Sequence, residues 1–382
     1  MMSTRTTGAS VLTALAIALV AADCSDGVGP RGQVPRFASA AAGAAGVALD
    51  QFDGTLGESG TLLIKGFNPT NPHRGDAIIA TFFWPGSTNI IDSVTDVLTT
   101  NPFSSVGNTY TLVDYVTAGG ISMATYVATN VQNFPDAWGG QLGDSILAVR
   151  ANLSQPVSDG GVLISAYSGV NVIAAQALGA HLSAWGSDSA PATADPGTIP
   201  VGVGALTYGV TRSNGFVGLS GPGAFHDILT MSDTSPMKAD GEYLVSASAG
   251  TVDPQWTWYF NAPSTWLATV LALNPPLHLV FTVQPTTTLP LMTIQPAVQV
   301  TATDAFGNAV TSFSGPVTIA IGHNSGLLLP GTLSGTKTVT AVNGVATFAD
   351  LSIDQPGNAY TLTVTASNMT GAESAAFNIG AF

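Results

Sequence analysis

The sequence predicts an all-β protein, a jelly-roll-like β-sandwich followed by an Ig-like β-sandwich. Only three glutamates and three lysines occur among 382 residues, although long straight side chains are the usual residues of surface helices. The chain has 43 glycines and 23 prolines and is rich in threonine, valine and serine, which suits strands and tight turns. Many short strand-like runs alternate with turn residues, as in sandwiches of antiparallel strands.

Residues 1–23 have the features of an export signal. Arg5 precedes an apolar run from Val11 to Val20, and small residues follow that run. This pattern is typical of a secretory signal peptide, and the run is too short to span a membrane as a stable anchor. The sequence therefore predicts export.

The single cysteine, Cys24, stands where the apolar run ends. The segment Ala21–Cys24 resembles the lipobox of bacterial lipoprotein signals, although Asp23 departs from the small residue that this family prefers there. The resemblance implies that Cys24 is lipidated, which would anchor the chain firmly in a membrane, and Ser25 resembles signals for the outer membrane. The alternative is ordinary cleavage after Ala22, which would leave a free thiol on a secreted protein.

The mature chain is expected to begin with a tether and a first β module. Residues 24–45 hold the anchor cysteine and a flexible stretch without apolar periodicity. Residues 46–275 form the jelly-roll-like sandwich, in which Ala118-Gly119-Gly120 marks a hairpin. Only Val172–Trp185 leaves helix and strand both open. This module resembles a jelly-roll-type domain of secreted bacterial proteins of unknown function, and the matching runs are "GNTYTLVDY", "GVLISAYSGV" and "TWLATVLALNP".

A second module is expected over residues 277–382. The pair Pro275-Pro276 ends the preceding strand, because proline cannot donate a hydrogen bond into a ladder. About seven short strand-like runs in roughly a hundred residues are the pattern of an Ig-like sandwich. The runs "PAVQVTATDAFGNAVTSFSGPVTIAI", "VNGVATFADLSI" and "YTLTVTA" resemble bacterial Ig-like repeats of invasin- and intimin-type surface proteins. The resemblance implies an extracellular spacer or adhesive unit, present here in one copy.

The segment "TNPHRGDAIIATFFW" contains Arg74-Gly75-Asp76, the tripeptide that animal integrins recognise. Pro72, Gly75 and Asp76 supply turn chemistry immediately before a run with strong strand character. We therefore predict a turn that opens a strand rather than an adhesion signal.

Charge and motif content exclude several function classes. The formal net charge of −14 would repel a phosphate backbone, so no nucleic-acid partner is expected. None of the five histidines forms a His-x-x-x-His pair, and each is interpreted singly as a surface residue. No Gly-x-Ser-x-Gly elbow occurs, and three glutamates make a Glu/Glu glycosidase pair improbable, although Asp pairs stay open. The sequence predicts a protein that is not an enzyme.

The six tryptophans divide into two groups by context. Trp138 and Trp185 stand among glycine, aspartate and serine, which predicts loops at the rim of a glycan-binding face. Asp136 and Asp144 would add hydrogen bonds or a calcium site there. The other four are predicted to lie in the core, namely Trp84, Trp256, Trp258 and Trp266.

These observations predict a non-enzymatic, exported cell-surface protein with a structural or adhesive role. The expected partners are the membrane, through a lipid, and a glycan or a surface protein. No cofactor is expected, and calcium is left open. The alternative is a glycan-binding surface lipoprotein that uses loops of the first module, and a secreted hydrolase ranks third. The expected location is the outer membrane or cell surface, with secretion as the alternative.

Overall fold

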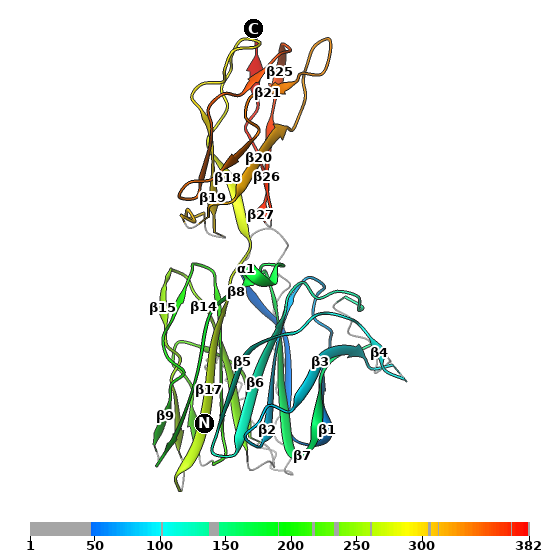
Figure 1. The fold of residues 1–382 in the computed structure, drawn as a ribbon, viewed down its shortest axis with the longest axis vertical. Helices are drawn as coiled ribbons and strands as arrows, with labels where there is room; N and C mark the ends of the chain where they lie inside the picture. The colour runs from blue at the N-terminus through cyan, green and yellow to red at the C-terminus, as the bar shows by residue number, and fades with distance from the viewer. Residues whose placement is uncertain are drawn as a thin grey trace, which may run out of the picture. The chain divides into compact units, whose positions relative to one another are not determined.

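The computed structural model describes residues 47–380 except 101, 137–144, 190, 216–217, 233–236, 260–261, 305–306, 312 and 368. These residues form an all-β sandwich structure, as the sequence predicted (Figure 1). Their one helix is α1 (Ala174–Ala177). No helix in this described part is long and apolar enough to cross a membrane.

The first sheet is built from consecutive strands of the amino-terminal half. Its strands run in the order β4-β3-β7-β2-β6-β5, and β1 also pairs with β7. The strands are β1 (Ala48–Gly66), β2 (Ala77–Pro85), β3 (Ile91–Leu98), β4 (Ser104–Ser105), β5 (Thr111–Ala118), β6 (Ile121–Ala128) and β7 (Leu147–Ser168).

A second sheet of five strands faces the first one across a hydrophobic core. Its order is β13-β14-β11-β17-β8. Phe83 and Leu163 of the first sheet and Tyr208 and Leu271 of the second belong to one buried cluster. The strands of this half are β8 (Leu178–Asp188), β9 (Ala192–Ala194), β10 (Ile199–Val201), β11 (Leu206–Ser213), β12 (Gly218–Ser220), β13 (His226–Met231), β14 (Lys238–Val245), β15 (Gly250–Val252), β16 (Trp256–Tyr259) and β17 (Ser264–Leu273).

The first sheet curls, so that side chains on its outer face pack against one another in a second buried cluster. Leu147 and Leu153 from one half of β7 share a buried cluster with Val162 and Ile164 from the other half. The pairing of β1 with β7 shifts register three times between Leu56 and Leu62, and such irregularities bend strands. The alternating pattern of β1 and β7 is therefore interrupted where the sheet folds over.

Residues 277–379 form a separate sandwich with its own core. Two four-stranded sheets, β23-β19-β18-β27 and β22-β20-β26-β28, enclose buried side chains that include Val300, Phe348, Tyr360 and Leu362. The pairs β21-β24 and β25-β29 complete it. The strands are β18 (Leu277–Val283), β19 (Val298–Thr303), β20 (Pro316–Ile321), β21 (Leu333–Ser334), β22 (Thr338–Thr340), β23 (Val345–Phe348), β24 (Ser352–Ile353), β25 (Gly357–Tyr360), β26 (Leu362–Ala366), β27 (Met369–Thr370), β28 (Ala372–Glu373) and β29 (Phe377–Ile379).

The predicted hairpin turn at Ala118-Gly119-Gly120 is confirmed. Gly119 and Gly120 join β5 to β6 with φ of 53° and 79°, values that glycine adopts without steric cost. Asn343 and Gly344, with φ of 49° and 82°, form a tight turn that is closed by two backbone hydrogen bonds between Val342 and Val345. The ambiguous segment Val172–Trp185 divides into the short helix α1 and the first part of β8.

Candidate metal site at the Arg-Gly-Asp turn

The segment before β2 forms a tight turn, as predicted. Gly75 has a φ of 98°, and its N–H donates to the carbonyl of Val131 at 2.8 Å. The N–H of Val131 in turn donates to the carbonyl of Asp76 at 3.0 Å. Asp76 is only 3% exposed, so its carboxylate is not presented to a receptor in the way that integrin recognition would need.

A buried asparagine fixes this turn against the end of the next loop. The side-chain amide of Asn71 donates to the carbonyls of Pro135 and Ser145 at 3.0 and 2.8 Å. Its Oδ1 accepts the N–H of Leu147, the first residue of β7, at 2.7 Å. Every donor and acceptor of this side chain therefore helps to position the turn.

Asp136, one of the predicted binding residues, lies beside the turn. Its Oδ1 accepts the backbone N–H of Arg74 at 2.7 Å, and its side chain is exposed. This hydrogen bond gives Asp136 a structural role in the turn.

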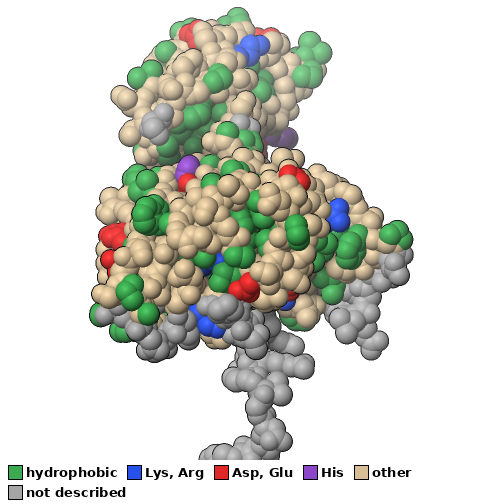
Figure 2. Space-filling model, turned by 60° about the horizontal axis from the view of Figure 1, so that its bottom comes forward, with side chains coloured by type: hydrophobic (Ala, Val, Ile, Leu, Met, Phe, Trp, Pro, Cys, Tyr) green, Lys and Arg blue, Asp and Glu red, His purple; other side chains and the backbone are tan. Residues whose placement is uncertain are grey.

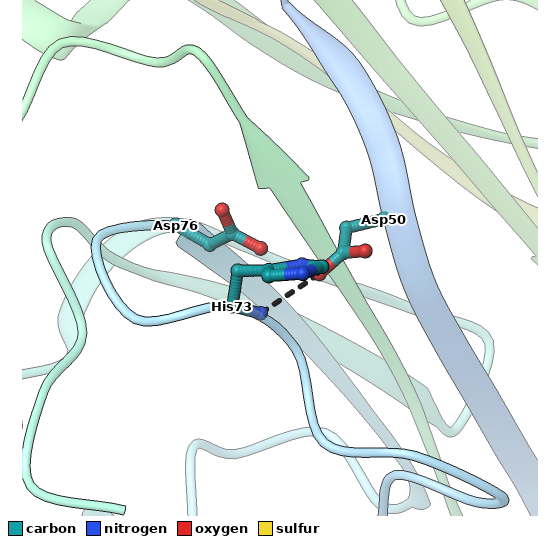
Figure 3. A group of neighbouring side chains, drawn as sticks. All are labelled: Asp50, His73 and Asp76. Carbon is teal, nitrogen blue, oxygen red and sulfur yellow. Dashed lines mark hydrogen bonds and ion pairs between the residues drawn. The ribbon is translucent and has the colours of Figure 1, made fainter. Parts of the chain in front are cut away.

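The turn brings His73 and Asp76 together with Asp50 of β1. One ligand atom from each of the three side chains lies within 4.8 Å of the others. Asp50 Oδ2 accepts the backbone N–H of His73 at 2.9 Å and lies 3.0 Å from His73 Nδ1. Figure 3 shows the Asp76 carboxylate turned toward this pair.

A β-bulge directs Asp50 into the group. Leu49 pairs with Tyr167 and Gln51 with Ala166 on β7, which leaves Asp50 as the extra residue between them. Bulges often re-aim a side chain next to a functional site. The sequence run "ALDQFDG" shows no sign of this irregularity, so the sequence analysis did not find the group.

The electrostatics of the group are unfavourable for two ionised carboxylates. Burial is the main cause that raises the pKa of Asp76, to about 9, and hydrogen bonding with Asp50 and its negative charge act in the same direction. A backbone hydrogen bond from His73 opposes the shift, and the charge of Asp136 adds to it. A carboxyl group in such surroundings gains from a bound proton or a nearby cation.

The three side chains are suitable ligands for a divalent metal ion. Carboxylate oxygens and an imidazole nitrogen are ligands of several such ions. The His73 side chain is 44% exposed, so solvent reaches the group on that side. His73 was interpreted from the sequence as an isolated surface histidine, and the structure corrects this because Asp50 and Asp76 adjoin it.

Of the other predicted binding residues, the structure describes only Trp185. Trp138 and Asp144 lie outside the described residues. Trp185 lies within strand β8 and pairs with Leu267, so the prediction that it belongs to a loop was wrong. Its side chain is 58% exposed.

Polar side chains accompany Trp185 on β8. Ser183 Oγ lies 2.9 Å from Thr269 Oγ1, and His181 Nδ1 lies 3.0 Å from Asp114 Oδ2 on β5. Burial raises the pKa of Asp114, and the neighbouring His181 opposes that shift. Residues at positions 181, 183 and 185 alternate along the strand and so share one face of β8.

The prediction for the other four tryptophans is confirmed. All of them are buried, and they are Trp84, Trp256, Trp258 and Trp266. Their indole N–H groups have partners; that of Trp84, for example, donates to the carbonyl of Thr88 at 3.1 Å.

The second sandwich has an exposed apolar surface that was not predicted from the sequence. We call it the apolar tip, and it comprises Leu289, Leu291, Met292, Leu327, Leu328 and Leu329, all exposed. The signal was present as "LPLM" and "GLLLPG", two apolar runs bounded by turn residues rather than by strand patterns.

Neither a protein-family model nor a curated protein sequence matches this chain.

Proposed function

We propose that this protein is a non-enzymatic, exported surface protein that makes adhesive contacts through its second sandwich. The observation that carries the proposal is the apolar tip. Leu328 is 92% exposed and Leu291 is 73% exposed. Contiguous exposed apolar patches on soluble proteins mark interaction surfaces, because leaving such area in water is unfavourable.

Backbone hydrogen bonds attach the two loops of the apolar tip to one segment, residues 353–356. Leu291 N–H donates to the carbonyl of Ile353 at 2.8 Å, and Leu327 N–H donates to the carbonyl of Pro356 at 3.0 Å. The loops therefore present their side chains from neighbouring positions. Residues 285–296 and 324–331 contain no charged side chain, which favours a partner with an apolar surface.

The surface location of the protein rests on its amino-terminal sequence. The export signal and the lipobox resemblance around Cys24 support a lipid-anchored protein at the outer membrane or cell surface. The resemblance of residues 277–382 to bacterial Ig-like repeats supports an extracellular adhesive unit. Figure 2 shows charged side chains spread over the face in view, without a basic patch that would suit nucleic acid.

The adhesive role can be tested with cells that display the full chain. Leu328→Ser combined with Leu291→Asn should reduce adherence to an apolar surface or a matrix protein several-fold. Asparagine is chosen because Leu291 has a φ of 66°, which asparagine tolerates. Val342→Ser is the matched control, since Val342 is an exposed aliphatic residue in a different turn of the same sandwich. Equal adherence of all three proteins would rule out the apolar tip as the contact surface.

Lipid anchoring is tested separately by Cys24→Ser. The variant should lose metabolic labelling with a fatty acid and should appear in the medium or the soluble envelope fraction. Continued membrane association without label would show that the chain is held by another means.

A second candidate function, glycan binding, is favoured by Trp185. An exposed indole beside polar side chains is a suitable platform on which a sugar ring can stack. Retention of the full chain on one insoluble polysaccharide, with loss of retention in Trp185→Ala but not in Leu182→Ala, would support this function. Leu182 is an exposed residue of the same strand, and equal retention of both variants would exclude Trp185 as the platform.

A further inference from the structure

The group of Asp50, His73 and Asp76 is assembled from β1 and from the turn before β2, and these two strands are not neighbours in the sheet. Leu49 of β1 and Ala77 of β2 both pair with Tyr167, so β7 runs between them. Adjacent strands lie about 4.8 Å apart, and the side chains must therefore reach across β7 to meet. The bulge at Asp50 and the turn before β2 make this possible.

One carboxylate oxygen of the group is buried without a hydrogen-bond partner. Asp76 is 3% exposed, and its Oδ2 has no hydrogen-bond partner. Within the described part of the chain, neither Asp76 nor Asp50 forms an ion pair with lysine or arginine. Unpaired buried acceptors are rare because their desolvation is costly, so this oxygen is suited to a nearby cation or a proton.

We propose that Asp50, His73 and Asp76 bind a divalent transition-metal ion of the zinc class. Two carboxylates and an imidazole are three protein ligands of the kind that zinc accepts, and the exposed side of His73 leaves room for water as a further ligand. Calcium prefers six to eight oxygen ligands, and the imidazole argues against it. This ion would differ from the calcium considered from sequence for Asp136 and Asp144.

The bound ion would connect the start of β1 to the turn before β2. Asp50 belongs to β1, while His73 and Asp76 belong to the turn that Asn71 fixes against β7. An ion that binds only the folded state stabilises that state. The inference concerns the first sandwich and is independent of adhesion through the apolar tip.

The test is a calorimetric titration of the full mature chain, stripped of metal with a chelator, with zinc, manganese and calcium chlorides in turn. We expect one zinc ion per chain, weaker binding of manganese, and no calcium binding at the same concentrations. His73→Gln and Asp50→Asn should each weaken zinc binding by roughly tenfold or more. The His73 side chain is 44% exposed, so its replacement should disturb folding little, and tryptophan fluorescence checks the fold of both variants.

Asp114→Asn is the matched control. Asp114 and His181 have the same carboxylate–imidazole contact of 3.0 Å, and the described residues provide no third ligand there. This variant should bind zinc like the unmodified chain. The proposal is overturned if zinc gives no heat of binding, if calcium binds as tightly as zinc, or if His73→Gln and Asp50→Asn bind zinc unchanged. Absence of binding would mean that Asp76 and Asp50 share a proton instead.

Discussion

Two carboxylates on one face of β14 are buried close together. Asp240 accepts hydrogen bonds from Thr230 Oγ1 at 2.6 Å and from Trp256 Nε1 at 2.9 Å. Burial raises the pKa of Asp240 to about 6. Burial, followed by the charges of Asp240 and Asp227, raises the pKa of Glu242 to about 8. The folded chain therefore binds protons more tightly here than the unfolded chain does.

The free energy of unfolding should consequently fall as pH rises from about 5 to above 8. The stabilising contribution of protonated Glu242 is complete below its unfolded pKa and is lost as pH rises through its raised pKa in the folded state. Glu242→Gln should stabilise the first sandwich at pH 9 by about 1–3 kcal/mol and should change its stability little at pH 5. Urea titrations followed by tryptophan fluorescence measure this, since all six tryptophans lie between residues 84 and 266.

Glu373→Gln provides the control, because Glu373 is exposed and lies in the second sandwich. Its fluorescence transition should follow that of the unmodified chain at every pH. If Glu242→Gln shows the same dependence on pH as the unmodified chain, Glu242 is ionised in the folded state and our assignment is wrong.

The candidate metal site shows where sequence reasoning ends at the scale of single residues. The turn at Gly75 was predictable because its residues are local and each has a known conformational preference. Asp50 was not predictable as its neighbour, because it lies 23 residues before His73. The contact depends on a bulge against β7, and pairing with a strand about a hundred residues away leaves no local pattern.

At the scale of elements, the turn between β5 and β6 was predicted from the sequence. The close approach of this turn to Thr265 of β17 could not be predicted in the same way. A Cβ on Gly119 would lie 2.1 Å from Thr265 Oγ1 of β17, whereas a Cβ on Gly120 would meet nothing within 4 Å. Both residues have a positive φ, so alanine at either position carries backbone strain of about 1–2 kcal/mol.

Gly119→Ala should therefore destabilise the first sandwich more than Gly120→Ala does. The additional cost of overpacking against Thr265 is about 1–3 kcal/mol. Urea titrations of the two variants measure the difference directly, because the strain at positive φ is common to both. Equal losses would show that the turn moves away from β17 at no cost.

Strand β8 also shows that pairing with a distant strand cannot be predicted from a local sequence pattern. The run "GSDS" after Trp185 has loop composition, yet the strand continues to Asp188 because Ser187 and Asp188 pair with Thr265 and Ser264 of β17. Trp266 donates its indole N–H to Asp188 Oδ2 at 3.2 Å. A partner strand almost eighty residues away overrides the local preference, as is common for strands.

At the scale of the whole molecule, composition and alternation sufficed for the all-β class. The order of strands within the sheets did not follow from them, because any amphipathic strand can pair with several others. The two groups of strands, β1–β17 and β18–β29, pair only among themselves in the described residues. Their buried clusters are also separate, and Asn274–Pro276 is the short link between β17 and β18.

This separation predicts that the two sandwiches unfold independently. Leu362→Ala removes a buried side chain from the second core and should destabilise that sandwich by about 2–5 kcal/mol. Hydrogen exchange of β26 should accelerate, while the tryptophan fluorescence transition stays in place. Leu271→Ala in the first core should give the reciprocal result. If either variant shifts both readouts together, the two cores form one cooperative unit, and contacts across the link must then contribute several kcal/mol to stability.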